Sequence, residues 1–190
     1  KSGCPVTVAC IAIPRCDASA YGCMQIDNNA MVTDFLEKPK DPPGMPNDEN
    51  HTLASMGIYV FNADYLYEVL TADANNENSR RDFGFDIIPA LVQQHKVHAH
   101  DFALSCIRNQ GWKDICYWRD VGTIDAYWEA NMDIAAVQPQ LDVYDTVWPI
   151  WTHQEQLPPA KFVQDISGAS SVVMNSVCSA GCIISGSSLC

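Results

Sequence analysis

The sequence predicts an α/β fold followed by a short parallel β-helix, and three observations support this prediction. Apolar runs typical of strands alternate with amphipathic segments up to about residue 137, which indicates a sheet packed between helical layers. Prolines and polar residues then interrupt a stretch that has no helical period. Beyond it, Val177, Ile183 and Leu189 recur six positions apart with small residues between them, as in hexapeptide repeats.

The first part of the chain reads as strands joined by turns. Residues 6–13 form an apolar run that predicts a buried strand. Residues 21–26 and 31–37 flank an Asx-rich turn at residues 27–29 and predict a hairpin. Residues 55–61 predict another buried strand.

Helices follow these strands. Asn62 predicts the N-cap of one helix. Residues 85–94 predict a second helix, which accommodates Pro89 only in its opening turn. Residues 97–102 return as a strand, and residues 123–136 predict the most clearly amphipathic helix of the chain.

The pattern divides the chain into three parts. We expect a sheet domain at residues 1–137, a linker at 138–162 and the first coils of a β-helix at 163–190. An ordinary hairpin would imitate the six-residue period over so few repeats, and stays open as the alternative.

The composition is that of a folded, acidic protein. Hydrophobic residues make up 47% of 190, and the formal net charge is −12. This content excludes intrinsic disorder, and no apolar run is long enough to span a membrane. A nucleic-acid binder needs a basic face to displace counterions, so we expect neither a nucleic-acid nor a membrane partner.

The cysteines do not form a recognisable framework. There are nine, an odd number, and none forms Cys-x-x-Cys. Most lie in apolar runs, as Cys10 does, where a thiol behaves as a small hydrophobic group. We therefore expect free thiols in a reducing compartment rather than disulfides or a metal site.

One predicted strand ends in a carboxylate, an ammonium and a proline, in Asp-Phe-Leu-Glu-Lys-Pro at residues 34–39. Open α/β sheets bind their ligands at such strand ends. Glu37 and Lys38 together are suited to a sugar hydroxyl and a phosphate of one small molecule. The alternative is a surface ion pair that closes the strand.

Three more residues are candidates for chemistry. Gly22 marks either a bulge or a point where a ligand approaches the backbone closely. Ser55, at the leading edge of a predicted strand, either reads a sugar hydroxyl or bonds to nearby backbone. Asp120 either binds Mg²⁺ together with substrate phosphates, pairs with Arg119, or caps the helix that follows.

Three motifs in this order resemble the bacterial-type ADP-glucose pyrophosphorylase (glucose-1-phosphate adenylyltransferase) family. They are Asp-Phe-Leu-Glu-Lys-Pro, Ser-Met-Gly-Ile-Tyr-Val-Phe at residues 55–61 and Trp-Arg-Asp-Val-Gly-Thr at residues 118–123. The resemblance covers essentially the whole chain, and residues 157–162 resemble the family's entry into its left-handed β-helix. It implies the C-terminal part of a Rossmann-like (GT-A-like) nucleotidyltransferase sheet.

The family joins ATP and glucose 1-phosphate, releasing pyrophosphate and ADP-glucose for glycogen or starch synthesis. Here the resemblance implies a glucose 1-phosphate site made by Gly22, Glu37, Lys38, Ser55 and Trp118. Lys38 would hold the phosphate, and Glu37 would read hydroxyls of the glucose ring. Asp120 would be one of two aspartates that hold Mg²⁺, and Lys38 and Asp120 would be the catalytic residues.

The resemblance also implies what surrounds the chain. The nucleotide loop with its arginine and the second aspartate would precede Lys1, so that this chain alone would be inactive. The complete protein would be an allosteric homotetramer in the cytoplasm, or in a plastid if a transit segment has been removed. Phe85, Trp151 and Ile166 depart from the family, whose members usually carry Lys, Arg and Arg there.

Two other functions remain open at this stage. One is a nucleotidyltransferase that uses UTP, dTTP or another sugar phosphate, since the residues that read the base would lie upstream. The other is a non-catalytic regulatory subunit of the same family. Retention of Lys38 and Asp120 argues against the subunit.

Overall fold

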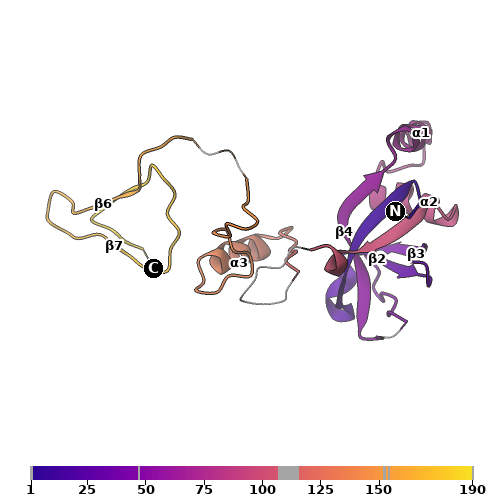
Figure 1. Ribbon diagram of the computed structural model, residues 1–190, viewed down its shortest axis with the longest axis horizontal. Helices are drawn as coiled ribbons and strands as arrows, with labels where there is room; N and C mark the ends of the chain where they lie inside the picture. Colours follow the sequence, from indigo (N-terminus) through magenta and orange to yellow (C-terminus); the bar gives the residue numbers. More distant parts are fainter. Residues whose placement is uncertain (1, 47, 107–115, 152, 154, 190) are drawn as a thin grey trace. The chain divides into compact units, whose positions relative to one another are not determined.

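The chain folds into two compact units, residues 1–106 and 107–190 (Figure 1). The structure, a computed structural model, describes residues 2–46, 48–106, 116–151, 153 and 155–189. A mixed sheet with its helices forms the first unit, and a helix followed by short parallel strands forms the second.

A five-stranded sheet with the order β3-β2-β4-β1-β5 organises the first unit. Its strands are β1 (Val6–Pro14), β2 (Gly22–Ile26), β3 (Val32–Glu37), β4 (His51–Phe61) and β5 (Val97–Asp101). β1 and β5 pair in parallel, and the other neighbours pair antiparallel. The predicted hairpin is confirmed as β2 and β3, whereas β4 begins four residues before the predicted start at residue 55.

Two α-helices, two 3₁₀ helices and one π-helix accompany these strands. They are η1 (Arg15–Ala20), α1 (Ala63–Ala74), the π-helix η2 (Phe83–Ile87), α2 (Ile88–Gln93) and η3 (Phe102–Leu104). The predicted cap is confirmed, because Asn62 Oδ1 accepts a hydrogen bond from the Tyr65 amide at 3.3 Å. The single helix predicted at residues 85–94 is instead η2 followed by α2, with Pro89 in the opening turn of α2.

The core lies between one face of the sheet and the segment formed by η2 and α2. Along the first half of β1, buried residues alternate with half-buried ones, as in a sheet that is covered on one face. Ile88, Leu91 and Val92 of α2 pack into this core. No residue of α1 is fully buried, but its Tyr65 and Val69 are partly buried and pack against the same core. None of the described helices is long and apolar enough to cross a bilayer.

The cysteines divide into two groups. Cys10 and Cys23 are buried in the sheet, as expected of small hydrophobic side chains. Burial, with the charge of Asp101, raises the pKa of the Cys10 thiol to about 12, so this thiol is unreactive. Cys106 and Cys116 are disulfide-bonded, and the expectation of free thiols is wrong for these two. No sequence motif marks them, since they lie ten positions apart.

The second unit begins with helix α3 (Ile124–Ile134), which confirms the helix predicted at residues 123–136. Thr123 is its N-cap, because the Thr123 hydroxyl accepts a hydrogen bond from the Ala126 amide at 3.1 Å. None of the residues of α3 is buried, and Ile124 and Trp128 on its apolar face are 87% and 60% exposed.

Short parallel strands follow α3 and confirm the β-helix. They are β6 (Lys161–Val163), β7 (Val172–Val173), β8 (Ile183–Ser185) and β9 (Ser188–Leu189). β6 pairs with β8 and β7 with β9, both in parallel, whereas the strands of a hairpin pair antiparallel. The hairpin alternative is therefore wrong.

The phase of the six-residue repeat differs from the expected one. Val177 and Ile183 are 51% and 72% exposed, while their neighbours Cys178 and Ile184 are partly buried. Successive side chains of a strand point to opposite faces, so a shift of one residue exchanges the inner and outer positions. The period was correctly predicted, and its inward positions at Cys178 and Ile184 lie one residue later than expected.

An irregularity in β4 requires a glycine. Val8 pairs with Tyr59 and Cys10 pairs with Ser55, so two steps along β1 correspond to four along β4. Gly57 lies in this bulge with φ +71°, which is the left-handed region. No atom lies within 4 Å of the position that a Cβ would take, so the backbone conformation alone requires glycine.

We expect Gly57→Ala to lower the free energy of unfolding of the first unit by about 1 kcal/mol, the cost of a left-handed residue with a Cβ. Urea unfolding followed by circular dichroism measures this loss. Tryptophan fluorescence would not report it, because all five tryptophans lie in the second unit. Gly57→Asn is the control, since asparagine tolerates this region and should lose less. Equal stability of Gly57→Ala and the wild type would contradict the assignment.

Candidate functional site

Three of the predicted site residues lie in one row across adjacent strands. Gly22 of β2 pairs with Glu37 of β3. On the other side of β2, Cys23 pairs with Ala54 of β4, and the next step of this antiparallel register sets Gly22 opposite Ser55. The structure therefore brings Glu37, Gly22 and Ser55 together from β3, β2 and β4.

Two glycines make room for the Glu37 carboxylate. A Cβ on Gly22 would lie 2.7 Å from Glu37 Oε2 and 2.5 Å from the ring of Phe35. A Cβ on Gly84, in η2, would lie 2.5 Å from the same Oε2. The bulge suggested for Gly22 is wrong, because the irregularity of the β2–β3 ladder falls between Gln25 and Ile26. Gly22 instead permits a close approach, by protein groups.

The Glu37 carboxylate is partly buried, and the part of the chain that the structure describes offers it no partner. Within the described residues it accepts no hydrogen bond and forms no ion pair, so the predicted surface ion pair with Lys38 is absent there. Burial raises the pKa of this carboxyl; the Lys38 charge lowers it and the Asp82 charge raises it further. The site thus holds an acceptor that no donor from the described residues satisfies.

Lys38 follows the last residue of β3 and leaves the sheet with a left-handed backbone. Its φ is +51°, and its amide donates a hydrogen bond to the Tyr21 carbonyl at 3.0 Å. The side chain is exposed, and its ammonium has no acceptor in the described part of the chain. Such backbone strain occurs preferentially at ligand sites, where it sets the direction of a side chain.

Ser55 is buried and lies inside β4, not at the leading edge of a strand as predicted. Its hydroxyl accepts a hydrogen bond from the Gly57 amide at 3.3 Å, so the bond to nearby backbone considered for it exists. A hydroxyl has one donor and two acceptor sites, so one site remains after this bond and the hydrogen bond with Tyr59. Ser55 therefore remains able to contact a ligand.

The sequence did not reveal a second set of residues, which η2 brings to the same place. The Phe83 ring stacks on Tyr59 at 5.6 Å and meets Phe61 edge-on at 5.9 Å, and these contacts fix η2 on β4. Burial raises the pKa of the Tyr59 hydroxyl; a hydrogen bond with Ser55 opposes this, and the charges of Glu37 and Asp82 add to it. Tyr59 thus belongs to the Glu37 group.

Asp82 carried a signal that could have been recognised. Its Oδ1 accepts hydrogen bonds from the amides of Gly84 at 2.8 Å and Phe85 at 2.9 Å, which is the geometry of a helix N-cap. An aspartate shortly before an apolar helical run predicts such a cap. For Tyr59 the sequence offers no comparable signal.

Trp118 and Asp120 belong to the second unit, whereas Gly22, Glu37, Lys38 and Ser55 belong to the first. The capping role considered for Asp120 is wrong, because Thr123 caps α3. No ion pair joins Asp120 to Arg119 in the described residues, where Arg119 Nη1 is buried without a hydrogen-bond partner. Asp120 is exposed to solvent.

The residues near Asp120 suit Mg²⁺ only as part of a shared site. The described part of the chain holds no group of three His, Cys, Asp or Glu side chains that could enclose a metal ion. Mg²⁺ is usually held by one or two carboxylates, with waters and substrate phosphate oxygens completing the octahedron. A single exposed carboxylate fits such a site and does not fit an all-protein cage.

Comparison with known proteins gives three findings. Residues 1–137 match the family model described as nucleotidyl transferase. Residues 158–190 match the model described as GlmU-like, C-terminal hexapeptide. Glucose-1-phosphate adenylyltransferase from Enterobacter sp. (strain 638) is 53% identical over 187 residues, which are 98% of this chain and 43% of that protein. The chain therefore spans less than half the length of this relative.

The raised pKa of Glu37 predicts how stability depends on pH. The folded state binds the proton more tightly than the unfolded state, so this group stabilises the fold fully at low pH and loses that contribution as the pH rises through its raised pKa. We expect Glu37→Gln to gain stability relative to the wild type as the pH rises above about 4, the ordinary pKa of a glutamate. Urea titrations at several pH values measure the difference, and one that shrinks with rising pH would contradict it.

Proposed function

The chain belongs to the nucleotidyl transferase family, and on this premise we propose that its complete protein makes ADP-glucose and pyrophosphate from ATP and glucose 1-phosphate. A phosphate oxygen of glucose 1-phosphate would attack the α-phosphorus of ATP. The bond from that phosphorus to the bridging oxygen would break, and pyrophosphate would leave. The named activity of the Enterobacter relative supports this choice of substrates.

One observation carries the proposal: the Glu37 carboxylate is partly buried, unpartnered and adjacent to an ammonium that is also unpartnered among the described residues. Sugar hydroxyls are donors that would satisfy the carboxylate, and charge-assisted bonds of this kind are among the stronger ones in proteins. A phosphate on the same sugar would satisfy Lys38. Ser55 and Tyr59 would add hydroxyl contacts beside them.

The proposed chemistry needs little beyond these groups. Both reactants are anions, so the enzyme has to reduce their mutual repulsion. It also has to hold them in the orientation that the reaction requires. Lys38 would neutralise charge on the sugar phosphate. Asp120 would hold Mg²⁺, which would neutralise charge on the nucleotide phosphates.

The proposal also includes a cytoplasmic homotetramer, as the family resemblance implies, and sedimentation of the complete protein tests the assembly.

We expect Lys38→Gln, in the protein produced from its complete coding sequence, to raise the KM for glucose 1-phosphate about tenfold or more. The KM for ATP should change little, because Lys38 contacts only the sugar phosphate. Initial rates of pyrophosphate release at varied substrate concentrations measure both values. Lys40→Gln, which removes an exposed ammonium two residues away, is the matched control. Equal effects of Lys38→Gln on both substrates would contradict the assigned role.

The same assay separates the nucleotides. Rates with ATP should exceed those with UTP or dTTP at equal concentration if the proposed substrates are right. A preference for UTP or dTTP would replace ATP in the proposal without changing the sugar-phosphate site. Absence of any turnover would favour the regulatory subunit.

We expect Asp120→Asn to raise the Mg²⁺ concentration that gives half-maximal activity and to leave the KM for glucose 1-phosphate nearly unchanged. An amide oxygen carries no net charge and so is the weaker ligand for Mg²⁺. Asp125→Asn, an exposed aspartate in the first turn of α3, is the matched control. An unchanged Mg²⁺ requirement in Asp120→Asn would remove Asp120 from the metal site.

A further inference from the structure

We propose that Gly84 of η2 is a positioning residue for the sugar-reading carboxylate: its missing side chain fixes where Glu37 Oε2 lies. The proposal rests on the function proposed above and concerns the same site. Gly84 is buried and lies far from Glu37 in the sequence. The contact between them therefore exists only in the folded protein.

Space, not backbone conformation, explains the glycine at this position. The left-handed glycines of the described residues are Gly3, Gly57, Gly168, Gly181 and Gly186. Gly84 is not among them, so its backbone is accessible to any residue. A Cβ there would meet Glu37 Oε2 at 2.5 Å and Glu37 Cδ at 2.9 Å, well inside van der Waals contact.

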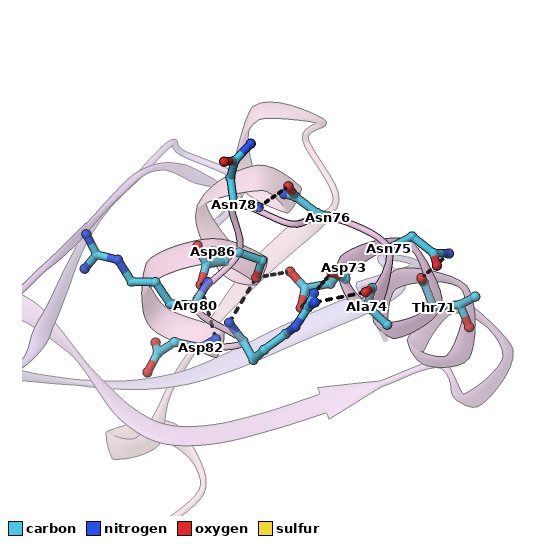
Figure 2. Close-up of polar contacts among 11 residues, drawn as sticks. Thr71, Asp73, Ala74, Asn75, Asn76, Asn78, Arg80, Asp82 and Asp86 are labelled. Atoms are coloured by element: carbon cyan, nitrogen blue, oxygen red, sulfur yellow. Dashed lines mark hydrogen bonds and ion pairs between the residues drawn. The ribbon is translucent and has the colours of Figure 1, made fainter.

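A hydrogen-bond network holds the Gly84 backbone in place, and Figure 2 shows the part of it that joins Asp86 to Arg80 and Asp82. Asp82 accepts from the Gly84 and Phe85 amides, as described above. Asp86 Oδ2 in turn accepts from the amides of Arg80 at 3.0 Å and Asp82 at 3.2 Å. Both carboxylates close the turn into the π-helix, a structure that is frequent at functional sites.

Arg81 ties this turn to the end of α1. Its guanidinium donates to the carbonyls of Asp73 and Ala74, which lie in the last turn of the helix, and it also pairs with the Asp73 carboxylate at 3.6 Å. Carbonyls in a last turn lack the usual partner four residues on, so these contacts stabilise the end of α1; the Asp73 carbonyl also accepts from the Asn76 amide at 3.0 Å. They also hold Arg81 at φ +64°, an unfavourable value for a residue with a Cβ.

Two sets of contacts therefore fix the position of Gly84 beside the Glu37 carboxylate. Phe83 fixes η2 on β4 through Tyr59 and Phe61, and the Arg81 contacts fix the start of η2 on α1. Gly84 is held from both sides and cannot retreat from Glu37. The carboxylate therefore has to take the position that Gly84 and Gly22 leave open.

This arrangement predicts that Gly84→Ala damages binding more than folding. The nearest atom to the added Cβ is the end of a flexible glutamate side chain, which can swing away with small effect on the core. The carboxylate would then move by about 1 Å, and displacements of that size are enough to reduce activity about a hundredfold. Gly22→Ala is less suitable, because its Cβ would also strike the buried Phe35 ring.

The test is a double-mutant cycle in the protein produced from its complete coding sequence. We expect Gly84→Ala to raise the KM for glucose 1-phosphate about tenfold or more, with the KM for ATP nearly unchanged. Glu37→Ala should raise the same KM. Adding Gly84→Ala to Glu37→Ala should produce no further change, because no carboxylate remains to be displaced.

Each result of this experiment either supports or overturns the positioning role of Gly84. An unchanged KM in Gly84→Ala, or effects of the two substitutions that multiply in the double variant, would overturn the positioning role. If Gly84→Ala fails to fold, the double variant replaces it: recovery of folding without the carboxylate supports the contact, and failure of both variants overturns it. A Glu37→Ala variant with normal KM for glucose 1-phosphate would reject the proposed function itself, whatever Gly84→Ala does.

Discussion

The proposed site in the first unit depends on one partly buried carboxylate, that of Glu37, which has no hydrogen-bond or ion-pair partner among the described residues. Partial burial removes part of the hydration of Glu37, and this desolvation raises the pKa of its carboxyl. Gly22 and Gly84 remove the side chains that would otherwise fill this place. The stability given up here is small beside the burial of the core, and it leaves an acceptor ready for a donor from solution.

The strands of the sheet hold the Glu37 side chain in a nearly fixed position. The antiparallel ladders align β3, β2 and β4, so a slip of one residue would send Glu37 to the opposite face of the sheet. Aromatic stacking of Phe83 on Tyr59 then adds η2 as a further wall. Phosphoryl and nucleotidyl transfers rely on positioning and charge neutralisation, and sites on strands hold their side chains more rigidly than sites on loops do.

The sequence revealed those features that depend on neighbours along the chain. The β2–β3 hairpin followed from its Asx-rich turn, the start of α1 from Asn62, and the end of β3 from Pro39. Contacts between residues that lie far apart in the sequence are not marked by any local pattern. Gly84 and Glu37 meet only because η2 folds back on the sheet, and Tyr59 reaches the site through a bulge that no local pattern marks. The β-helix shows the same limit: its period was visible, but its phase depends on packing.

The left-handed backbone of Lys38 has a consequence for how this position can evolve. Glycine or asparagine would relax the chain at φ +51° and strengthen the end of β3, whereas the proposed phosphate contact needs an ammonium. Thermal stability and substrate affinity therefore favour different residues at position 38. Selection for robustness alone would remove the lysine, and its persistence in a lineage would record continued selection for catalysis.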